Sequence, residues 1–224
     1  MTLLRPLSPF VLVLVLAACS ACGDDDGSTA DAAPPDPCAP QMTFTGEYVD
    51  WDSGGSIGFM GIAFANVTLR SDPTFTDVTA PNGRFEICIP AADGLADVIP
   101  MNGSTYPSGV IVVNRAVLSS LPTQSYRAFT STRAADYGFS ASLAHVFVHI
   151  VGGSRTVTPA AGAEVMQHND GVNWTVGNTG TDLYFGNIPV SAQTTLNVEG
   201  GRVTGPTTIP LSAGAFTYVT LIAN

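Results

Sequence analysis

Apolar and polar residues alternate in short segments from Thr43 to the end of the chain. In the segment 84–89 every second residue is apolar, beginning at Phe85, and the segment 144–151 follows the same pattern from Val146. Alternation with a period of two predicts strands with one buried face. Further segments of this kind, separated by Gly, Pro, Asn and Asp, are 66–70, 163–168, 183–185, 196–198 and 216–222. The pattern predicts an all-β protein, and the turn signal Pro81-Asn82-Gly83 favours a hairpin between 66–70 and 84–89.

Helix signals are scarce. Only the segment 115–121, which Pro122 ends, and the segment 131–143 favour a helix. Both lie between the strand-rich halves 41–113 and 144–224. We therefore expect two β-sandwiches in tandem, joined by a partly helical connection at 114–143.

The two halves have similar sequences. Ala65 and Val67 recur as Ala163 and Val165, 98 residues later, and the same offset relates Phe85 to Leu183. This predicts two copies of one β unit. The alternative is a chance similarity between two ordinary β-sandwiches.

The N-terminus carries the pattern of an export signal. Arg5 precedes an uninterrupted apolar run over residues 10–18, which is too short to cross a bilayer core of about 30 Å. The residues Leu16-Ala17-Ala18-Cys19 resemble the bacterial lipobox, in which the signal peptide is removed before a cysteine that receives lipid. The resemblance implies a signal peptide over 1–18 and lipidation of Cys19. The following residue, Ser20, implies the outer rather than the inner membrane.

Residues 19–40 are small, acidic and rich in proline. They contain Asp24, Asp25, Asp26, Asp31 and Asp36, five of the eighteen acids of the chain. Such a segment repels itself and has little apolar surface to bury, so we expect an extended tether. Calcium binding at residues 24–26 is the alternative, but a flexible acidic run lacks the geometry that calcium requires.

The charged residues exclude several kinds of chemistry. The formal charge is −10, and all eight basic residues are arginine. Without lysine, neither a P-loop nor a pyridoxal phosphate site can be built. The acidic balance argues against nucleic acid as a partner.

One longer segment resembles a known family. Gly61, Ala65 and Val67 are followed by a Thr-rich stretch and then by Gly83-Arg84-Phe85-Glu86-Ile87. This order resembles the carboxypeptidase regulatory-like domain, a small transthyretin-like β-sandwich, over residues 43–113. In the second half, residues 159–165 fit the pattern, but residues 181–185 lack its Gly-x-Phe. We therefore expect the two β-sandwiches to be transthyretin-like or immunoglobulin-like, and the resemblance implies a non-catalytic surface module.

Two cysteines remain once Cys19 carries lipid and Cys22 lies in the tether. Cys38 and Cys88 are then the favoured disulfide pair, because exported proteins meet an oxidising environment. Cys88 is expected to face outward, opposite Phe85 and its inward neighbours, where the incoming tether reaches it. Two free thiols, or Cys22 as the partner, are the alternatives.

The histidines offer the only candidate metal site. His145 and His149 share the face opposite Val146, and antiparallel pairing with 163–168 would bring His168 near His145 and Glu164 near His149. Such ligands bind zinc or copper. Residues four apart in a strand stand about 13 Å apart, so the four residues cannot share one ion. We expect a solvated or partly covered polar face, no metal and no cofactor.

Other candidate chemistry is weaker. No serine-hydrolase elbow, metalloprotease motif or dinucleotide fingerprint occurs. Asp50 and Asp52 resemble the start of a calcium loop, but Gly54 and Gly61 stand where further ligands belong. Stacking surfaces for sugars could be provided by Trp51, Trp174, Tyr48, Tyr106 and Tyr126.

Together these observations predict a lipid-anchored envelope protein that is not an enzyme. It would act as a binding or structural module for a protein or glycan partner. The alternative is a metal-dependent or hydrolytic enzyme that uses the histidine-bearing face of the second half.

Overall fold

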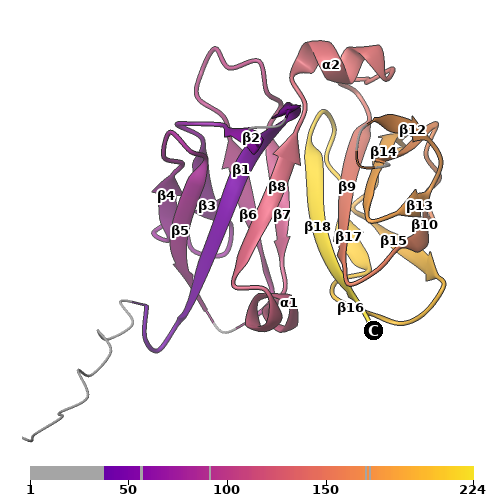
Figure 1. Ribbon diagram of the computed structural model, residues 1–224. Coiled ribbons are helices and arrows are strands. Elements are labelled where there is room, and N and C mark those ends of the chain that lie inside the picture. The colour runs from indigo at the N-terminus through magenta and orange to yellow at the C-terminus, as the bar shows by residue number, and fades with distance from the viewer. Residues whose placement is uncertain (1–37, 56–57, 91, 170, 172) are drawn as a thin grey trace, which may run out of the picture. The chain divides into compact units, whose positions relative to one another are not determined.

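The computed structural model describes residues 38–55, 58–90, 92–169, 171 and 173–224 (Figure 1). Strands make up 53% and helices 7% of the structure, which confirms the predicted all-β fold class. The signal peptide, Cys19, Cys22 and most of the tether lie outside the described residues. In the described part, no helix has the length and apolar character needed to cross a membrane.

Twenty strands and helices follow one another along the described chain. In the first half they are β1 (Met42–Gly55), β2 (Gly58–Gly61), β3 (Asn66–Leu69), β4 (Thr76–Val78), β5 (Arg84–Ile89), β6 (Gly94–Ile99), β7 (Gly109–Val113), α1 (Arg115–Ser120), β8 (Thr123–Ala128) and α2 (Ser131–Asp136). In the second half they are β9 (Ala144–Val151), β10 (Arg155–Pro159), β11 (Val165–Asn169), β12 (Trp174–Val176), β13 (Thr179–Gly180), β14 (Asp182–Ile188), β15 (Gln193–Glu199), β16 (Val203–Thr204), β17 (Thr208–Pro210) and β18 (Phe216–Ala223).

The strands form three sheets. The first joins β2, β1 and β5, with β8 also paired to β1. The second has the order β13-β10-β15-β17. The third is a ten-stranded sheet of order β12-β11-β14-β9-β18-β7-β6-β3-β4, with β16 paired to β18, and it runs through both halves of the chain.

The large sheet has a hydrophobic core on each face, because side chains alternate between the two faces of its strands. Phe147 of β9 and Phe216 of β18 belong to a core rich in aromatic residues, which Phe44 and Tyr126 of the first sheet complete. Val146 and Val148 point the other way, into a mainly aliphatic core shared with the second sheet. Strand β9 is therefore covered on both faces.

The two halves share one pattern of strand pairing. In the first half, β1 pairs with β5 antiparallel and with β8 parallel, while β6 pairs with β3 and β7, both antiparallel. In the second half, β9 pairs in the same senses with β14 and β18, and β15 pairs with β10 and β17. The pairing matches β5 with β14, as the sequence offset does, but it matches β3 with β10 rather than with β11.

The two halves join edge to edge. β18, the last strand of the second half, pairs in parallel with β7 of the first half, so that Thr217 lies opposite Val110 (Figure 1). The segment 114–143 contains the two short helices, and it also contains β8, which belongs to the first sheet. The domain boundaries proposed from the sequence remain a prediction.

The expected hairpin between 66–70 and 84–89 is wrong. β3 pairs with β4 and β6, whereas β5 pairs with β1 in the other sheet. The turn at residues 81–83 therefore connects two sheets. Gly61 explains the close approach there, because a Cβ atom at this residue would lie 2.0 Å from the carbonyl carbon of Asn82.

The predicted disulfide between Cys38 and Cys88 is confirmed, with the two Cα atoms 5.1 Å apart. Thr43 of β1 lies opposite Cys88 of β5, so the bond closes the end of this strand pair. Closing a loop with a sequence separation of 50 residues restricts the unfolded chain and stabilises the folded one.

Candidate functional site

A groove runs along β8, between the first sheet and residues of β9, β14 and β18 in the large sheet. At one end it opens into a cavity of about 280 Å³, lined by Trp51, Phe59, Arg127, Asn169, Gly171, Thr181 and Asp182. At the other end lies a cavity of about 240 Å³, lined by Glu47, Leu121, Thr123, Gln124, Ser125, His149, Val151 and Thr220. Between them lies a cavity of only about 20 Å³, whose walls include Ser125, Arg127 and His149 and which shares lining residues with both. We call this feature the β8 groove.

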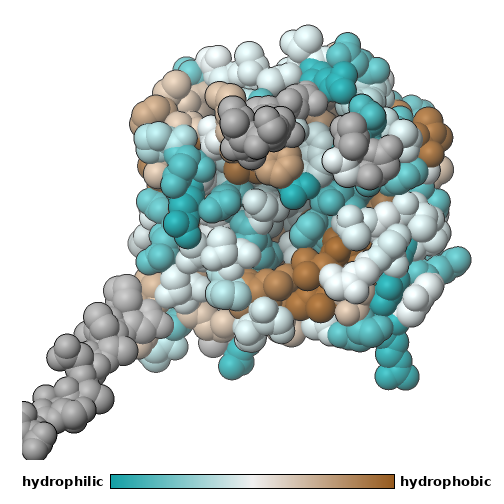
Figure 2. Space-filling model, in the orientation of Figure 1, coloured by the Kyte–Doolittle hydropathy of each residue, from teal (hydrophilic) through white to brown (hydrophobic). Residues whose placement is uncertain are grey.

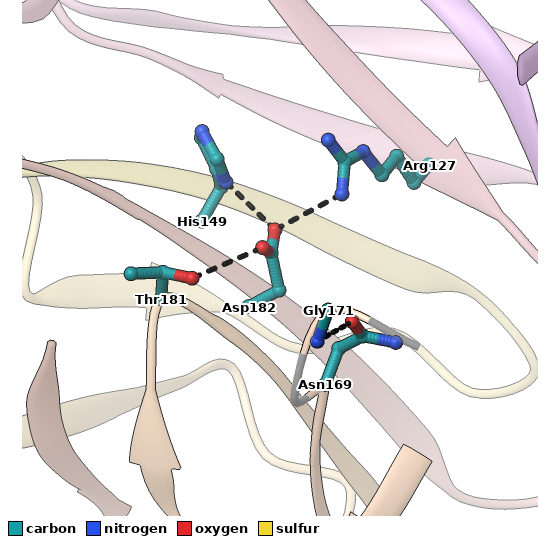
Figure 3. A network of polar contacts seen from close by, with 6 residues as sticks. All are labelled: Arg127, His149, Asn169, Gly171, Thr181 and Asp182. Atoms are coloured by element: carbon teal, nitrogen blue, oxygen red, sulfur yellow. Dashed lines mark hydrogen bonds and ion pairs between the residues drawn. The ribbon is translucent and has the colours of Figure 1, made fainter. Parts of the chain in front are cut away.

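Asp182 lies at the centre of a polar network in the groove (Figure 3). Its carboxylate accepts a hydrogen bond of 2.7 Å from Nδ1 of His149 and lies 3.5 Å from a guanidinium nitrogen of Arg127. The Thr181 hydroxyl donates to the second carboxylate oxygen at 3.3 Å. The register explains the contact with His149, because Asp182 and His149 are direct partners on β14 and β9.

The network keeps Asp182 ionised. Burial alone would raise the pKa of Asp182, but the hydrogen bond from His149 and the electrostatic interactions with His149 and Arg127 outweigh it, so the pKa lies below its ordinary value. Burial also disfavours the charged form of Arg127. It lowers the pKa of Arg127, although the charge of Asp182 raises it. The ion pair links β8 of the first half to β14 of the second.

Arg127 also binds aromatic rings. Its guanidinium carbon lies 4.2 Å from the ring centre of Trp51 and 4.4 Å from that of Phe59. Such contacts favour a cation on the electron-rich face of a ring. Trp51 in turn lies 4.8 Å, between ring centres, from Trp174. The two tryptophans of the chain thus belong to one cluster at the Arg127 end of the groove.

The opposite end of the groove is more apolar. Leu121 follows α1, Val151 ends β9, and both are half-buried. The face drawn in Figure 2 carries an apolar patch in its lower middle, over the region between α1 and the end of β9 in Figure 1. The groove therefore has a polar and aromatic end and an aliphatic end.

The wall of the groove is a strand with an open edge. Among the described residues, β8 pairs only with β1. Gln124, Tyr126 and Ala128 of β8 are buried, whereas Ser125 and Arg127 are half-buried on the side of the groove. Because peptide groups of a strand point alternately to its two sides, about half of the backbone donors and acceptors of β8 face away from β1.

The structure does not bring the four candidate metal ligands together. β14 lies between β11 and β9, so the predicted direct pairing of 163–168 with the histidine-bearing strand is wrong. His168 lies opposite Leu183, the neighbour of Asp182, and therefore on the other face of the sheet from His149. Within the described part of the chain, no group of three or more His, Cys, Asp or Glu side chains is placed to hold a metal ion.

Each of these candidates has another role. His145 is fully buried rather than solvated or partly covered as expected. Its Nε2 donates to the Ser140 carbonyl at 3.1 Å, which leaves Nδ1 to accept from the Tyr184 hydroxyl at 3.1 Å. Burial lowers the pKa of His145, so the ring is neutral. Glu164 accepts a hydrogen bond of 3.1 Å from the Asn187 amide.

His168 lies near β12, where its Nε2 is 3.2 Å from the Thr175 hydroxyl. It makes no contact with the groove network.

The His149–Asp182 pair has the same two residue types as the histidine–carboxylate part of a nucleophilic triad. Ser125 and Thr220 line the same groove. A triad needs its hydroxyl within hydrogen-bond reach of the histidine, and among the described residues neither hydroxyl forms a hydrogen bond with the His149 ring. Asp182 instead forms an ion pair with Arg127, and this pair joins the two halves.

The aromatic residues do not form a flat sugar platform. Trp51 is covered by Arg127 and packs against Trp174 and Phe59. Tyr48 and Tyr126 are buried in the core. Asp50 accepts a hydrogen bond from the Tyr106 hydroxyl, and the side chain of Asp52 lies outside the described part.

Sequence reasoning missed Arg127, Asp182 and β8. The alternation of Gln124, Tyr126 and Ala128 on one face is a strand signal, but it is short and contains a buried amide. Nothing in the sequence pairs Arg127 with Asp182, because that contact depends on how the two halves join.

Comparisons with known proteins add little. No protein-family model matches the chain, and no curated protein matches it. Similar solved structures include the Bacillus anthracis TIE protein (9% identity, TM-score 0.25), a streptococcal ancillary pilin (11%, 0.24) and a mutant of the Streptococcus pyogenes major pilin (10%, 0.21).

The matches cover 82%, 82% and 81% of this chain and 34%, 62% and 97% of the other chains, so this chain spans less than two thirds of the first two. TM-scores this low carry no conclusion about fold, location or function.

Proposed function

We propose that this protein is a non-catalytic binding module of the bacterial cell envelope, and that a protein partner binds in the β8 groove. The observation that carries the proposal is the groove itself, with the open edge of β8 as its wall. Its length, from the Arg127 cluster to Leu121 and Val151, spans the strand from end to end. A polar end and an aliphatic end suit a peptide segment with side chains of both kinds.

A protein partner fits the groove better than a glycan. Sugars bind proteins by laying their apolar faces on exposed rings, and the ring of Trp51 is occupied by Arg127 and Trp174. The backbone edge of β8 offers hydrogen bonds that suit another backbone. A hydrolytic role is not favoured, because no hydroxyl among the described residues forms a hydrogen bond with the His149 ring.

The location belongs to the same proposal. The apolar run over 10–18 and the lipobox-like residues before Cys19 support export, with lipid attached to Cys19 and the protein held at the outer membrane. More than one acyl chain is needed for stable attachment, since each buried methylene contributes about 0.8 kcal/mol. The acidic segment up to residue 40 would hold the folded part away from the membrane.

Fractionation tests the anchor. Cys19→Ala is expected to release the protein from the membrane or to leave it uncut, and Cys22→Ala is the matched control that should remain anchored. If the Cys19→Ala protein still enters the detergent phase at its mature size, the assignment of Cys19 is wrong.

Intrinsic fluorescence tests binding in the groove. The chain has two tryptophans, and both belong to the cluster at its polar end, so the signal reports on this site. We would select linear peptides on the processed protein by phage display and titrate them, alongside soluble envelope oligosaccharides. We expect a saturable change with a peptide and no cleavage of it.

Ser125→Phe would fill the groove and should abolish the fluorescence change. Thr195→Phe places the same side chain on an exposed position of β15 and should leave it intact. Binding of sugars alone, or hydrolysis of a bound peptide, would overturn the proposal.

A further inference from the structure

The two halves differ at one equivalent edge. β18 pairs in parallel with β9, as β8 pairs in parallel with β1. The outer edge of β18 pairs in parallel with β7 over residues 216–218 and antiparallel with the two-residue strand β16 at residues 222–223. Among the described residues, the outer edge of β8 has no such neighbour. The strand that pairs with β18 in the second half therefore indicates which kind of strand would bind the equivalent edge of β8 in the first half.

We propose that the β8 groove binds its partner by strand addition: an extended segment of another protein pairs in parallel with β8. This inference rests on the proposed function and specifies how the same groove recognises its ligand. The partner is an extended peptide because its backbone would complete the hydrogen bonds of the open edge. Parallel pairing follows from the equivalence of β8 with β18, whose longer outer neighbour, β7, runs parallel.

The walls of the groove define the side chains of this segment. β8 runs from Thr123 at the aliphatic end to Arg127 at the polar end. A parallel segment runs in the same direction, so an aliphatic residue near Leu121 and Val151 comes first. About four residues later, after some 13 Å of strand, a polar residue reaches Arg127 and Asp182.

The groove is open at its two ends, where the cavities hold about 280 and 240 Å³, and a segment that spans it must displace the side chains that narrow its middle to about 20 Å³. Ser125 contributes a short side chain at its middle, and His149 retains an exposed fraction of 35%. In Figure 3 the second ring nitrogen of His149 points away from Asp182, so the polar network leaves it available. An open strand edge in a protein is usually blocked by charges, proline or a covering element, whereas β8 contains no proline and its one charged side chain, Arg127, is ion-paired with Asp182.

A peptide with the sequence of residues 108–114, which includes β7, is the first probe because β7 fills the equivalent edge. Peptides from the phage selection are the second. Binding to the processed protein is followed by tryptophan fluorescence and by amide hydrogen exchange. We expect a saturable fluorescence change together with slower exchange within residues 123–128.

Backbone methylation distinguishes strand addition from side-chain binding. Two versions of each peptide carry N-methyl groups on alternate residues. A strand that pairs through one edge uses every second amide, so one version should lose roughly tenfold or more in affinity, as expected for about one lost hydrogen bond, while the other keeps its affinity. Peptides with the order of residues reversed should bind more weakly.

Two outcomes would overturn the inference. A fluorescence change without protection of residues 123–128, or equal losses for both methylated versions, rejects strand addition but leaves the groove as a binding site. Peptides of either source that bind nowhere in the groove reject both the inference and the proposed function.

Discussion

The two halves of the molecule share one pattern of strand pairing, but only the second half forms a core whose buried residues are all its own. The aliphatic core of the second half is built from buried residues between Ala144 and Leu221. The aromatic core of the first half includes four residues that the second half contributes, namely Phe147, Tyr184, Phe216 and Tyr218. Equivalent topology thus does not make the halves equivalent folding units, because one borrows part of its core from the other.

The same asymmetry explains the groove. The second half uses β18 to cover the edge of β7, and this shared sheet places β9 and β14 beneath the edge of β8. The first half has no corresponding strand, among the described residues, to cover β8. Its open edge therefore lies beside polar residues of the second half, and the Arg127–Asp182 ion pair connects the two.

Separating the halves should have the largest effect. Residues 38–143 alone would lose the four borrowed aromatic side chains, each worth about 1.5–3 kcal/mol when buried, and a sum of this size matches the whole stability of a typical domain. We expect no cooperative unfolding transition in circular dichroism. Residues 144–224 alone should keep one, while binding a hydrophobic dye on the exposed aromatic face. Cooperative unfolding of both pieces would instead support two independent domains.

Truncation of a borrowed side chain tests the same dependence inside the intact protein. Phe147 packs against Phe129 of the first half and against Tyr218, with ring centres 5.3 and 5.7 Å apart. Phe147→Ala should lower the free energy of unfolding by about 3–5 kcal/mol, measured by urea denaturation. Thr195→Ala, at an exposed position of β15, is the control and should change it by less than about 0.5 kcal/mol.

The disulfide provides the next contrast, since it holds the first half only. Replacing both Cys38 and Cys88 by alanine should cost about 2–4 kcal/mol, and adding reductant to the unaltered protein should have the same effect. Because the bond joins the segment just before β1 to β5, amide exchange should increase most in those two strands. An equal increase in β14 and β15 would show that the halves unfold together.

Much of this asymmetry could not be predicted from the sequence. Period-two alternation located strands such as 84–89 and 144–151, because a strand with one buried face has an apolar residue at every second position. It could not say which strands pair. Alternation is the same whether β5 pairs with β3 or with β1, and whether β11 or β14 lies beside β9.

The site was less predictable than the fold for a related reason. The tryptophans stood out as rare residues, and His149 as one of three histidines. Arg127 and Asp182 are ordinary charges until the joining of β18 to β7 brings β8 close to β14. The disulfide could be predicted because only Cys38 and Cys88 remain to pair once the two N-terminal cysteines are assigned to the lipid anchor and the tether.

The smallest expected effect concerns two histidines on one face of β9. His145 is buried, and burial lowers its pKa below the ordinary value of 6.5. The unfolded chain therefore binds a proton at a higher pH than the folded one. The free energy of unfolding should be constant above about pH 6.5 and should fall as the pH drops from there toward the lowered pKa of the folded state.

His145→Gln should remove this part of the pH dependence, because glutamine does not titrate, while the loss of ring packing against Phe139 lowers the stability at every pH. His149→Gln is the matched control on the same strand face. It should leave the fall below about pH 6.5 in place, since the buried imidazole remains at residue 145. Urea denaturation between about pH 5 and 8 measures the difference. If the slope is unchanged in His145→Gln, another group titrates, and the buried ring is not the source of the acid sensitivity.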